Sequence, residues 1–117
     1  MECVEAGQLS GPRVDKLLDG LLEPWKRKPI KAVVLGCTHY PFLRAAIAAH
    51  LPAGTPLVDG NLGTARQLER RLREENLLSP GPGGQVTFLS SLEGQQAHMQ
   101  RMLDWQRADN NTAYAAN

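Results

Sequence analysis

The sequence predicts an α/β fold, a three-layer sandwich with a mainly parallel sheet. Segments of helical spacing alternate along the chain with short runs of β-branched and aliphatic residues, and glycine or proline separates them. Each connection between successive predicted strands is long enough to hold the crossover helix that parallel pairing requires. At 117 residues the chain has room for one domain with a modest core.

The first predicted elements are a lead-in, a helix and a buried strand. Residues 1–11 are expected to form a loop-like lead-in, and a proline at Pro12 suits the first turn of the helix that follows. Pro24 should kink or end this helix. A run of aliphatic residues then predicts a strand over 31–35. The residues expected on the inward face of the helix are Val14, Leu17, Leu18, Leu21, Leu22 and Trp25.

Two more helices and a second strand are predicted next. Pro41 begins a helix, residues 57–59 form a short parallel strand, and residues 60–64 open a third helix. The carboxyl ends of both strands should therefore lie at one edge of the sheet. The inward-facing residues are expected to be Leu43, Ala46, Ile47 and Leu51 in one helix and Leu62, Ala65, Leu68 and Leu72 in the other.

The domain organisation follows from a connector rich in proline and glycine at residues 79–84. Residues 1–78 before it are predicted to form one lobe, and residues 85–107 after it a strand over 85–89 followed by a helix. Met99, Met102 and Leu103 are candidate buried residues of that helix. The small, polar residues 108–117 are expected to fray.

Composition and charge argue against several classes of protein. With 42% hydrophobic and 21% charged residues the chain resembles an ordinary soluble globular protein. The net charge is only +1 and the basic residues are scattered, which argues against nucleic acid as a partner. No apolar run reaches the ~20 residues of a membrane span, and the acidic start Met1–Glu5 argues against a secretory signal, so a cytoplasmic location is expected. Neither a disulfide nor a metal site is predicted.

The candidate site is the turn of residues 36–40, Gly-Cys-Thr-His-Tyr, between the first strand and the next helix. In open α/β sheets this edge binds ligands. A helix amino terminus and the imidazole of His39 would both favour the thiolate of Cys37, which makes this thiol a candidate base or nucleophile. The alternatives are a small buried cysteine for Cys37 and a satisfied, partly buried imidazole for His39. His50 and His98 are expected on helix surfaces far from the turn.

Residues 34–41, Val-Leu-Gly-Cys-Thr-His-Tyr-Pro, resemble the second cysteine motif of the glutamate racemases, which make D-glutamate for peptidoglycan. The resemblance runs from about Val4 to about Trp105 and covers the carboxyl-terminal half of such an enzyme, one lobe of a two-lobe racemase fold. It implies that Cys37 is one of two cysteines that exchange the α-proton on opposite faces of the substrate, without a cofactor.

The same resemblance implies roles for four neighbours of Cys37. Thr38 and His39 would contact the substrate glutamate, and His39 would also tune the thiol; aspartate racemases tend to have Gly-Cys-Thr-Glu at this turn. Glu5 would be an electrostatic neighbour of the site and Asp59 would fix the turn. The alternatives are a turn hydroxyl for Thr38, a plain surface glutamate for Glu5 and a helix cap for Asp59.

The Asp-Ser-Gly and Cys-Asn-Thr turns of the family's first lobe do not occur in this sequence. Cys3 does not match their context and is expected to be an incidental terminal thiol. The chain alone is therefore expected not to racemise glutamate, and the predicted partners are a complementary amino-terminal lobe or further copies of the chain. The alternatives are a non-catalytic module that binds a small carboxylate or a protein, and an aspartate racemase-like enzyme.

Overall fold

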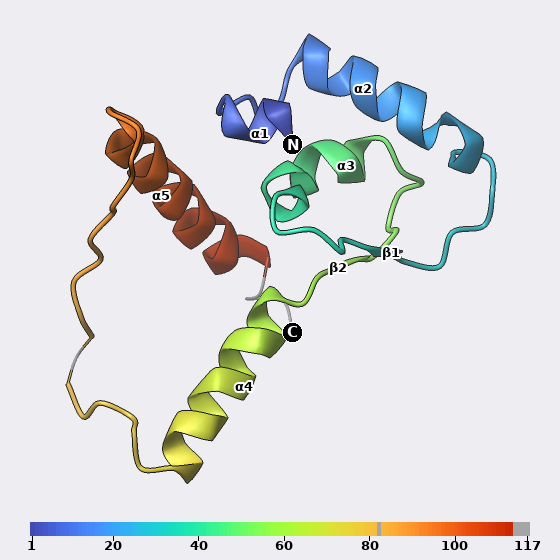
Figure 1. Ribbon diagram of the computed structural model, residues 1–117. Helices are drawn as coiled ribbons and strands as arrows, with labels where there is room; N and C mark the ends of the chain where they lie inside the picture. The colour runs from blue at the N-terminus through green and yellow to red at the C-terminus, as the bar shows by residue number, and fades with distance from the viewer. Residues whose placement is uncertain (82, 114–117) are drawn as a thin grey trace. The chain divides into compact units, whose positions relative to one another are not determined.

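The computed structural model describes residues 1–81 and 83–113 of the chain. The chain divides into two compact units, of which the first spans Met1–Gly83 and the second begins at Gly84 (Figure 1). This division falls inside the predicted connector, residues 79–84. Among the described residues, no helix is both long enough and apolar enough to cross a membrane.

The first unit holds two parallel strands and the helices that connect them. Val33 lies opposite Leu57 and Val34 opposite Val58. The α/β class and the parallel pairing are therefore confirmed, although each strand has only two residues. In chain order its elements are α1 (Glu2–Glu5), α2 (Pro12–Leu22), η1 (Glu23–Trp25), β1 (Val33–Val34), η2 (Tyr40–Leu43), α3 (Arg44–Ala49), β2 (Leu57–Val58) and α4 (Asn61–Glu74).

The core of this unit is small and apolar. Helices α2 and α3 pack against each other, and each buries part of the apolar side that its spacing predicted. Burial of these side chains supplies the main driving force for folding of the unit. The buried side chains are those of Cys3, Val4, Val14, Leu18, Leu35, Leu43, Ile47 and Leu51.

The amino terminus differs from the prediction. The predicted irregular lead-in contains a single helical turn, α1, which buries Cys3 and Val4. Gly7 follows it with a φ of 69°, a conformation that glycine adopts without steric cost. Cys3 is only 6% exposed, so the prediction of an incidental terminal thiol is wrong. The short helix was missed because one turn gives too few residues for a periodic pattern.

Helix α2 buries only part of its predicted apolar face. Val14 and Leu18 are buried, whereas Leu17, Leu21 and Trp25 are at least half exposed. The apolar stripe of the helix is therefore wider than the part of it that is buried. As predicted, the α-helix ends before Pro24, which lies in the 3₁₀ turn η1.

The segment after the candidate turn is also less regular than the continuous helix predicted from Pro41. Its first turn is the 3₁₀ helix η2, and the α-helical part, α3, begins only at Arg44. A proline lacks the backbone N–H, and tight 3₁₀ turns are frequent at helix starts. Leu43, Ile47 and Leu51 are nevertheless buried as predicted.

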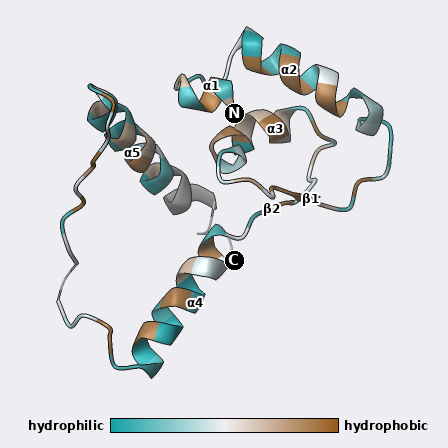
Figure 2. Cartoon of the chain, in the orientation of Figure 1, coloured by the Kyte–Doolittle hydropathy of each residue, from teal (hydrophilic) through white to brown (hydrophobic). Residues whose placement is uncertain are grey.

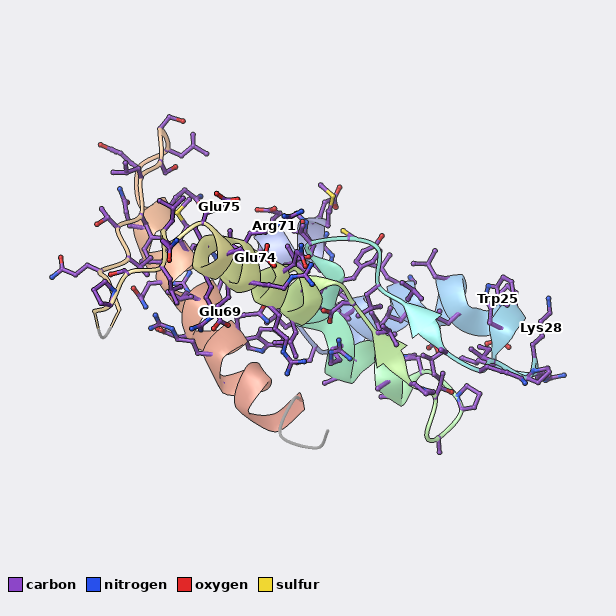
Figure 3. All side chains as sticks on the ribbon, turned by 90° about the horizontal axis from the view of Figure 1, so that it is seen from below. Trp25, Lys28, Glu69, Arg71, Glu74 and Glu75 are labelled. Carbon is purple, nitrogen blue, oxygen red and sulfur yellow. The ribbon has the colours of Figure 1, made fainter. Side chains whose placement is uncertain are left out.

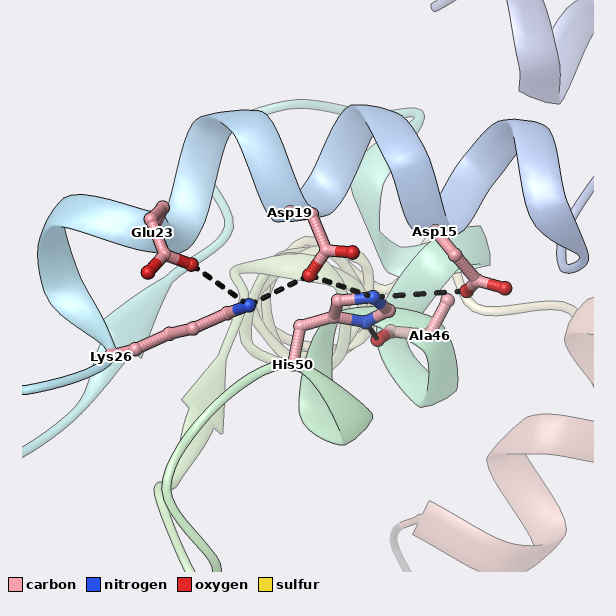
Figure 4. A network of polar contacts seen from close by, with 6 residues as sticks. All are labelled: Asp15, Asp19, Glu23, Lys26, Ala46 and His50. Carbon is pink, nitrogen blue, oxygen red and sulfur yellow. Dashed lines mark hydrogen bonds and ion pairs between the residues drawn. The ribbon is translucent and has the colours of Figure 1, made fainter.

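A polar network joins the end of α3 to α2 (Figure 4). His50 donates from Nδ1 to the carbonyl of Ala46 at 2.8 Å, and its Nε2 lies 3.8 Å from Asp15 and 3.7 Å from Asp19. Lys26 contacts Asp19 at 2.7 Å and Glu23 at 3.1 Å. The side chain of His50 is only 13% exposed, so its prediction as a surface residue is wrong. Sequence spacing could not indicate this because the partners come from another helix.

Helix α4 carries hydrophobic residues beside charged ones, and none of its residues is buried (Figure 2). Leu62 and Leu72 are half-buried, whereas Ala65 and Leu68 are exposed, which contradicts the predicted inward stripe. Ion pairs such as Arg71–Glu74, at 3.5 Å, lie along its polar side (Figure 3). The same figure shows Lys28 over the ring of Trp25, 4.5 Å from its centroid.

The second unit contains the helix α5 (Gln95–Ala113). The strand predicted over 85–89 is not formed, because an alternating segment adopts a strand only when a partner pairs with it. Met99, Met102 and Leu103 are half-buried, and so is His98, which was predicted on the surface. Helix α5 continues to Ala113, so the first part of the predicted frayed tail, residues 108–117, is helical. Residues 114–117 of that tail lie outside the described residues.

Candidate functional site

The candidate site lies where the two parallel strands end. Residues 36–39 follow β1 and lead directly into η2, and Asp59 follows β2. Because the strands are parallel, these segments share one edge of the sheet. The structure thus places the Cys37 turn at the carboxyl-end edge of the sheet, as the sequence predicted.

The thiol of Cys37 is half-buried and is surrounded by groups that stabilise its anion. The backbone N–H of His39 donates to Sγ at 3.5 Å, and the backbone of Tyr40 provides a second hydrogen bond. The Nδ1 atom of His39 lies 4.0 Å from the same sulfur. The turn therefore wraps two backbone donors and one imidazole around the thiol.

The imidazole of His39 is held from both sides. Its Nε2 lies 2.6 Å from Oε1 of Glu5, a residue 34 positions earlier in the chain. A carboxylate can only accept a hydrogen bond, so Nε2 carries the hydrogen. The other ring nitrogen, Nδ1, faces Cys37 and lies 3.3 Å from the hydroxyl oxygen of Thr38. Glu5 thus fixes the tautomer that leaves Nδ1 free to exchange a proton on the side of the thiol.

These contacts shift the two ionisations in opposite directions. The backbone hydrogen bond from His39 is the largest cause that lowers the pKa of Cys37, and burial opposes it. The hydrogen bond to Glu5, followed by that to Cys37, raises the pKa of His39. Both shifts favour the pair of thiolate and imidazolium. An arrangement in which a neighbouring base is itself oriented by a third group is one that activates a thiol.

The lowered pKa of Cys37 can be checked by alkylation. We expect the rate of iodoacetamide modification at Cys37 to rise with a midpoint below about 8.5, the value of a free cysteine. In His39→Asn the midpoint should move upward because the imidazole is lost. It should stay below the ordinary value because the backbone N–H groups of residues 39 and 40 remain. Peptide mass spectrometry across a pH series measures the rate at this one cysteine.

The control for this measurement is the same cysteine in the unfolded chain. In concentrated urea the backbone donors and the imidazole are no longer held near Sγ, so the midpoint should return to the ordinary value. Equal midpoints in the folded and unfolded protein would contradict the proposed arrangement of the turn.

Asp59 lies at the same edge but has partners of its own. Its Oδ1 accepts from the backbone N–H of Asn61 at 2.9 Å, and its Oδ2 pairs with Arg44. The bond to the backbone of Asn61 is an Asx turn before α4, whose N-cap residue is Gly60 and has no side-chain cap, so Asp59 is not the helix cap that the alternative named. A role of Asp59 in fixing the Cys37 turn stays a prediction.

Arg44 is the residue of this region that the sequence reasoning missed. Besides the ion pair with Asp59, it donates from Nη1 to the carbonyl of Leu57 at 2.7 Å. It therefore ties the start of α3 to β2. The sequence did contain a signal for this role. Arg44 stands between Leu43 and Ile47 on the inward side of the helix, and a charged residue on that side needs a buried partner.

The groups gathered at the turn, one of them from α1, suit proton transfer and hydrogen bonding to a small polar ligand. They are one thiol, one imidazole, one hydroxyl and one carboxylate, from Cys37, His39, Thr38 and Glu5. Within residues 1–81 and 83–113, no group of three or more histidine, cysteine, aspartate or glutamate residues could hold a metal ion.

Comparison with curated proteins finds glutamate racemases. That of Pseudomonas entomophila (strain L48) is 37% identical over 109 residues, which are 93% of this chain and 41% of the relative. That of Clostridium botulinum (strain Alaska E43 / Type E3) is 39% identical over 92 residues, 78% of this chain and 36% of the relative. No protein-family model matches the chain. The chain spans about two fifths of the length of the curated relatives it matches.

Solved structures give the same result. Glutamate racemase from Thermus thermophilus in complex with β-chloro-D-alanine superposes with a TM-score of 0.70 at 35% identity, covering 87% of this chain and 40% of that one. Glutamate racemase from Francisella tularensis in complex with D-glutamate gives 0.71 at 28% identity, covering 86% and 38%. The chain is therefore a homologue of the glutamate racemases, consistent with the carboxyl-terminal half of such an enzyme.

Proposed function

We propose that this chain is the carboxyl-terminal lobe of a glutamate racemase and that Cys37 is one of the two thiols that exchange the α-proton of glutamate. Similarity to glutamate racemases along most of the chain supports a racemase function. The identity of the substrate and the placement of the two thiols on two separate lobes are part of the proposal.

The observation that carries the proposal is the arrangement of Glu5, His39 and Cys37. The imidazole lies between a carboxylate at 2.6 Å and a thiol at 4.0 Å. As a base, the Cys37 thiolate would remove the α-proton of one enantiomer. As an acid, the Cys37 thiol would donate a proton to the carbanion formed from the other enantiomer. His39 would stabilise the thiolate, and Thr38 would bind the substrate carboxylate through its hydroxyl.

Inversion needs a second acid–base group on the opposite face of the substrate. A single thiol can return a proton only to the face from which it came, so one lobe alone cannot complete inversion. The chain spans only about 40% of its relatives, and we assign the second thiol to a complementary amino-terminal lobe. The cytoplasmic location stays a prediction from the sequence, and the supply of D-glutamate for peptidoglycan stays a prediction from the family resemblance.

The test is α-proton exchange of D-glutamate in heavy water, followed by NMR. The isolated chain is expected to show no rapid exchange. Mixed with the part of the P. entomophila enzyme that this chain does not match, it is expected to exchange the proton and to form L-glutamate. Formation of L-glutamate by the isolated chain would contradict the need for a second lobe. Binding of glutamate without any exchange in the mixture would instead indicate a non-catalytic binding module.

A further inference from the structure

We propose that the pocket beside the amino end of β1 is a binding site for a small organic carboxylate with an apolar body, and that Lys28 and Lys31 hold the carboxylate group. This pocket lies at the end of β1 that is opposite to the Cys37 turn. None of the residues that line it belongs to the turn of residues 36–40, so its ligand would be separate from the substrate of the proposed function.

The pocket has a volume of 570 Å³ and mainly apolar walls. This volume lies within the range of about 300–1,000 Å³ that is typical of small-molecule sites. The walls come from the end of α2 and η1, from the segment that leads into β1, and from the chain just after α3. The apolar residues that line the pocket are Leu22, Trp25, Pro29, Ile30, Ala32, Val33 and Leu51. An apolar ligand body would therefore be in contact with the protein on several sides.

The charges at this pocket all have one sign. Lys28 and Lys31 line it, and no acidic side chain among the described residues does. The Nζ atom of Lys28 lies 4.5 Å from the centroid of the Trp25 ring, and this cation–π contact keeps the ammonium group at the pocket (Figure 3). The pocket therefore combines apolar walls with positive charge.

No carboxylate of the protein neutralises these two lysines. Asp19 and Glu23, near the end of α2, both pair with Lys26, at 2.7 Å and 3.1 Å. Within residues 1–81 and 83–113, no ion pair involves Lys28 or Lys31. The attraction between opposite charges is stronger near an apolar surface than in bulk water, so the two ammonium groups favour a ligand with a negative charge.

Trp25 and the two lysines together indicate the chemistry of the ligand. Trp25 is 50% exposed, so its ring is accessible to a ligand in the pocket that it lines. Aromatic rings pack favourably against an indole, and a flexible lysine can approach a carboxylate from many directions. A carboxylate joined to an aromatic ring by a short alkyl chain meets both requirements.

The test titrates phenylbutyrate into the full chain carrying Trp105→Phe. The sequence contains two tryptophans, so Trp25 is then the one that fluoresces. We expect a saturable change of its fluorescence, and calorimetric titration of the unaltered chain should give the same affinity. Phenylbutanol has the same body without the charge and should bind about fivefold more weakly or less tightly still. Added salt should weaken the binding of phenylbutyrate but not that of phenylbutanol.

Substitution of the lysines tests their role. Lys31→Gln should weaken the binding of phenylbutyrate by about fivefold and leave that of phenylbutanol unchanged, and Lys28→Gln combined with it should weaken phenylbutyrate binding further. Both lysines are exposed, so the variants should fold as the unaltered chain does. The matched control is Lys16→Gln, because Lys16 is exposed on α2 and lies outside the pocket. It should leave the affinity for phenylbutyrate unchanged.

Three results would overturn the proposal. The first is equal affinity for phenylbutyrate and phenylbutanol. The second is an affinity for phenylbutyrate that neither Lys31→Gln nor the double variant alters. The third is a change of Trp25 fluorescence on dilution of the chain with no response to phenylbutyrate, which would show that a second copy of the chain covers the pocket.

Discussion

Substitution of Cys37 by serine is expected to lower the rate of α-proton exchange in the mixture with the complementary lobe by about a hundredfold or more. Serine keeps nearly the same shape, and the N–H groups of His39 and Tyr40 can still donate to its oxygen. Its hydroxyl does not ionise near neutral pH, however, so no base of comparable strength faces the substrate. NMR in heavy water, with D-glutamate and then L-glutamate, measures the loss for each enantiomer.

Two controls separate chemistry from folding in this experiment. Ala53→Ser makes a similar small change on an exposed loop, and its exchange rate should equal that of the unaltered chain. Circular dichroism should show that Cys37→Ser remains folded, since the cysteine is only half-buried. If exchange persisted in Cys37→Ser, another group would be the base, and the proposed role of the thiol would be wrong.

Substitution of Arg44 by methionine is expected to reduce the free energy of unfolding by about 3 kcal/mol. The partner carboxylate, Asp59, is only 3% exposed and the Arg44 side chain 18%. Methionine keeps the apolar stem of the side chain but leaves the carboxylate without its guanidinium, and the carbonyl of Leu57 loses a donor. Urea denaturation, followed by circular dichroism, measures the change.

A double substitution tests the cause of this loss. Arg44→Met combined with Asp59→Leu removes both charges, so the double variant should be more stable than Arg44→Met alone. Arg70→Met is the matched control, because Arg70 is 64% exposed on α4 and its substitution should change stability by less than about 0.5 kcal/mol. Equal losses in Arg44→Met and Arg70→Met would contradict an important role for the buried pair.

Local sequence signals predicted the elements that depend on neighbouring residues. The spacing of Val14 and Leu18 predicted the buried side of α2, and Gly36 and Pro41 marked the turn that carries Cys37. Such signals failed where the formation or burial of an element depends on another segment that pairs with it or covers it. The strand predicted over 85–89 is not formed, and α4 buries none of its residues, because a pattern shows which side can be buried but not whether anything covers it.

The sequence by itself determined the α/β class, the parallel order of β1 and β2, and the position of Cys37 and His39 on the turn at the end of β1. Only the tertiary structure decided that Glu5 reaches His39 across 34 positions, that Arg44 pairs with Asp59, and that His50 lies against α2. The physical reason is that strands, helices and turns arise from interactions between near neighbours in the chain. Contacts between distant side chains depend on how those elements pack, which no spacing in the sequence specifies.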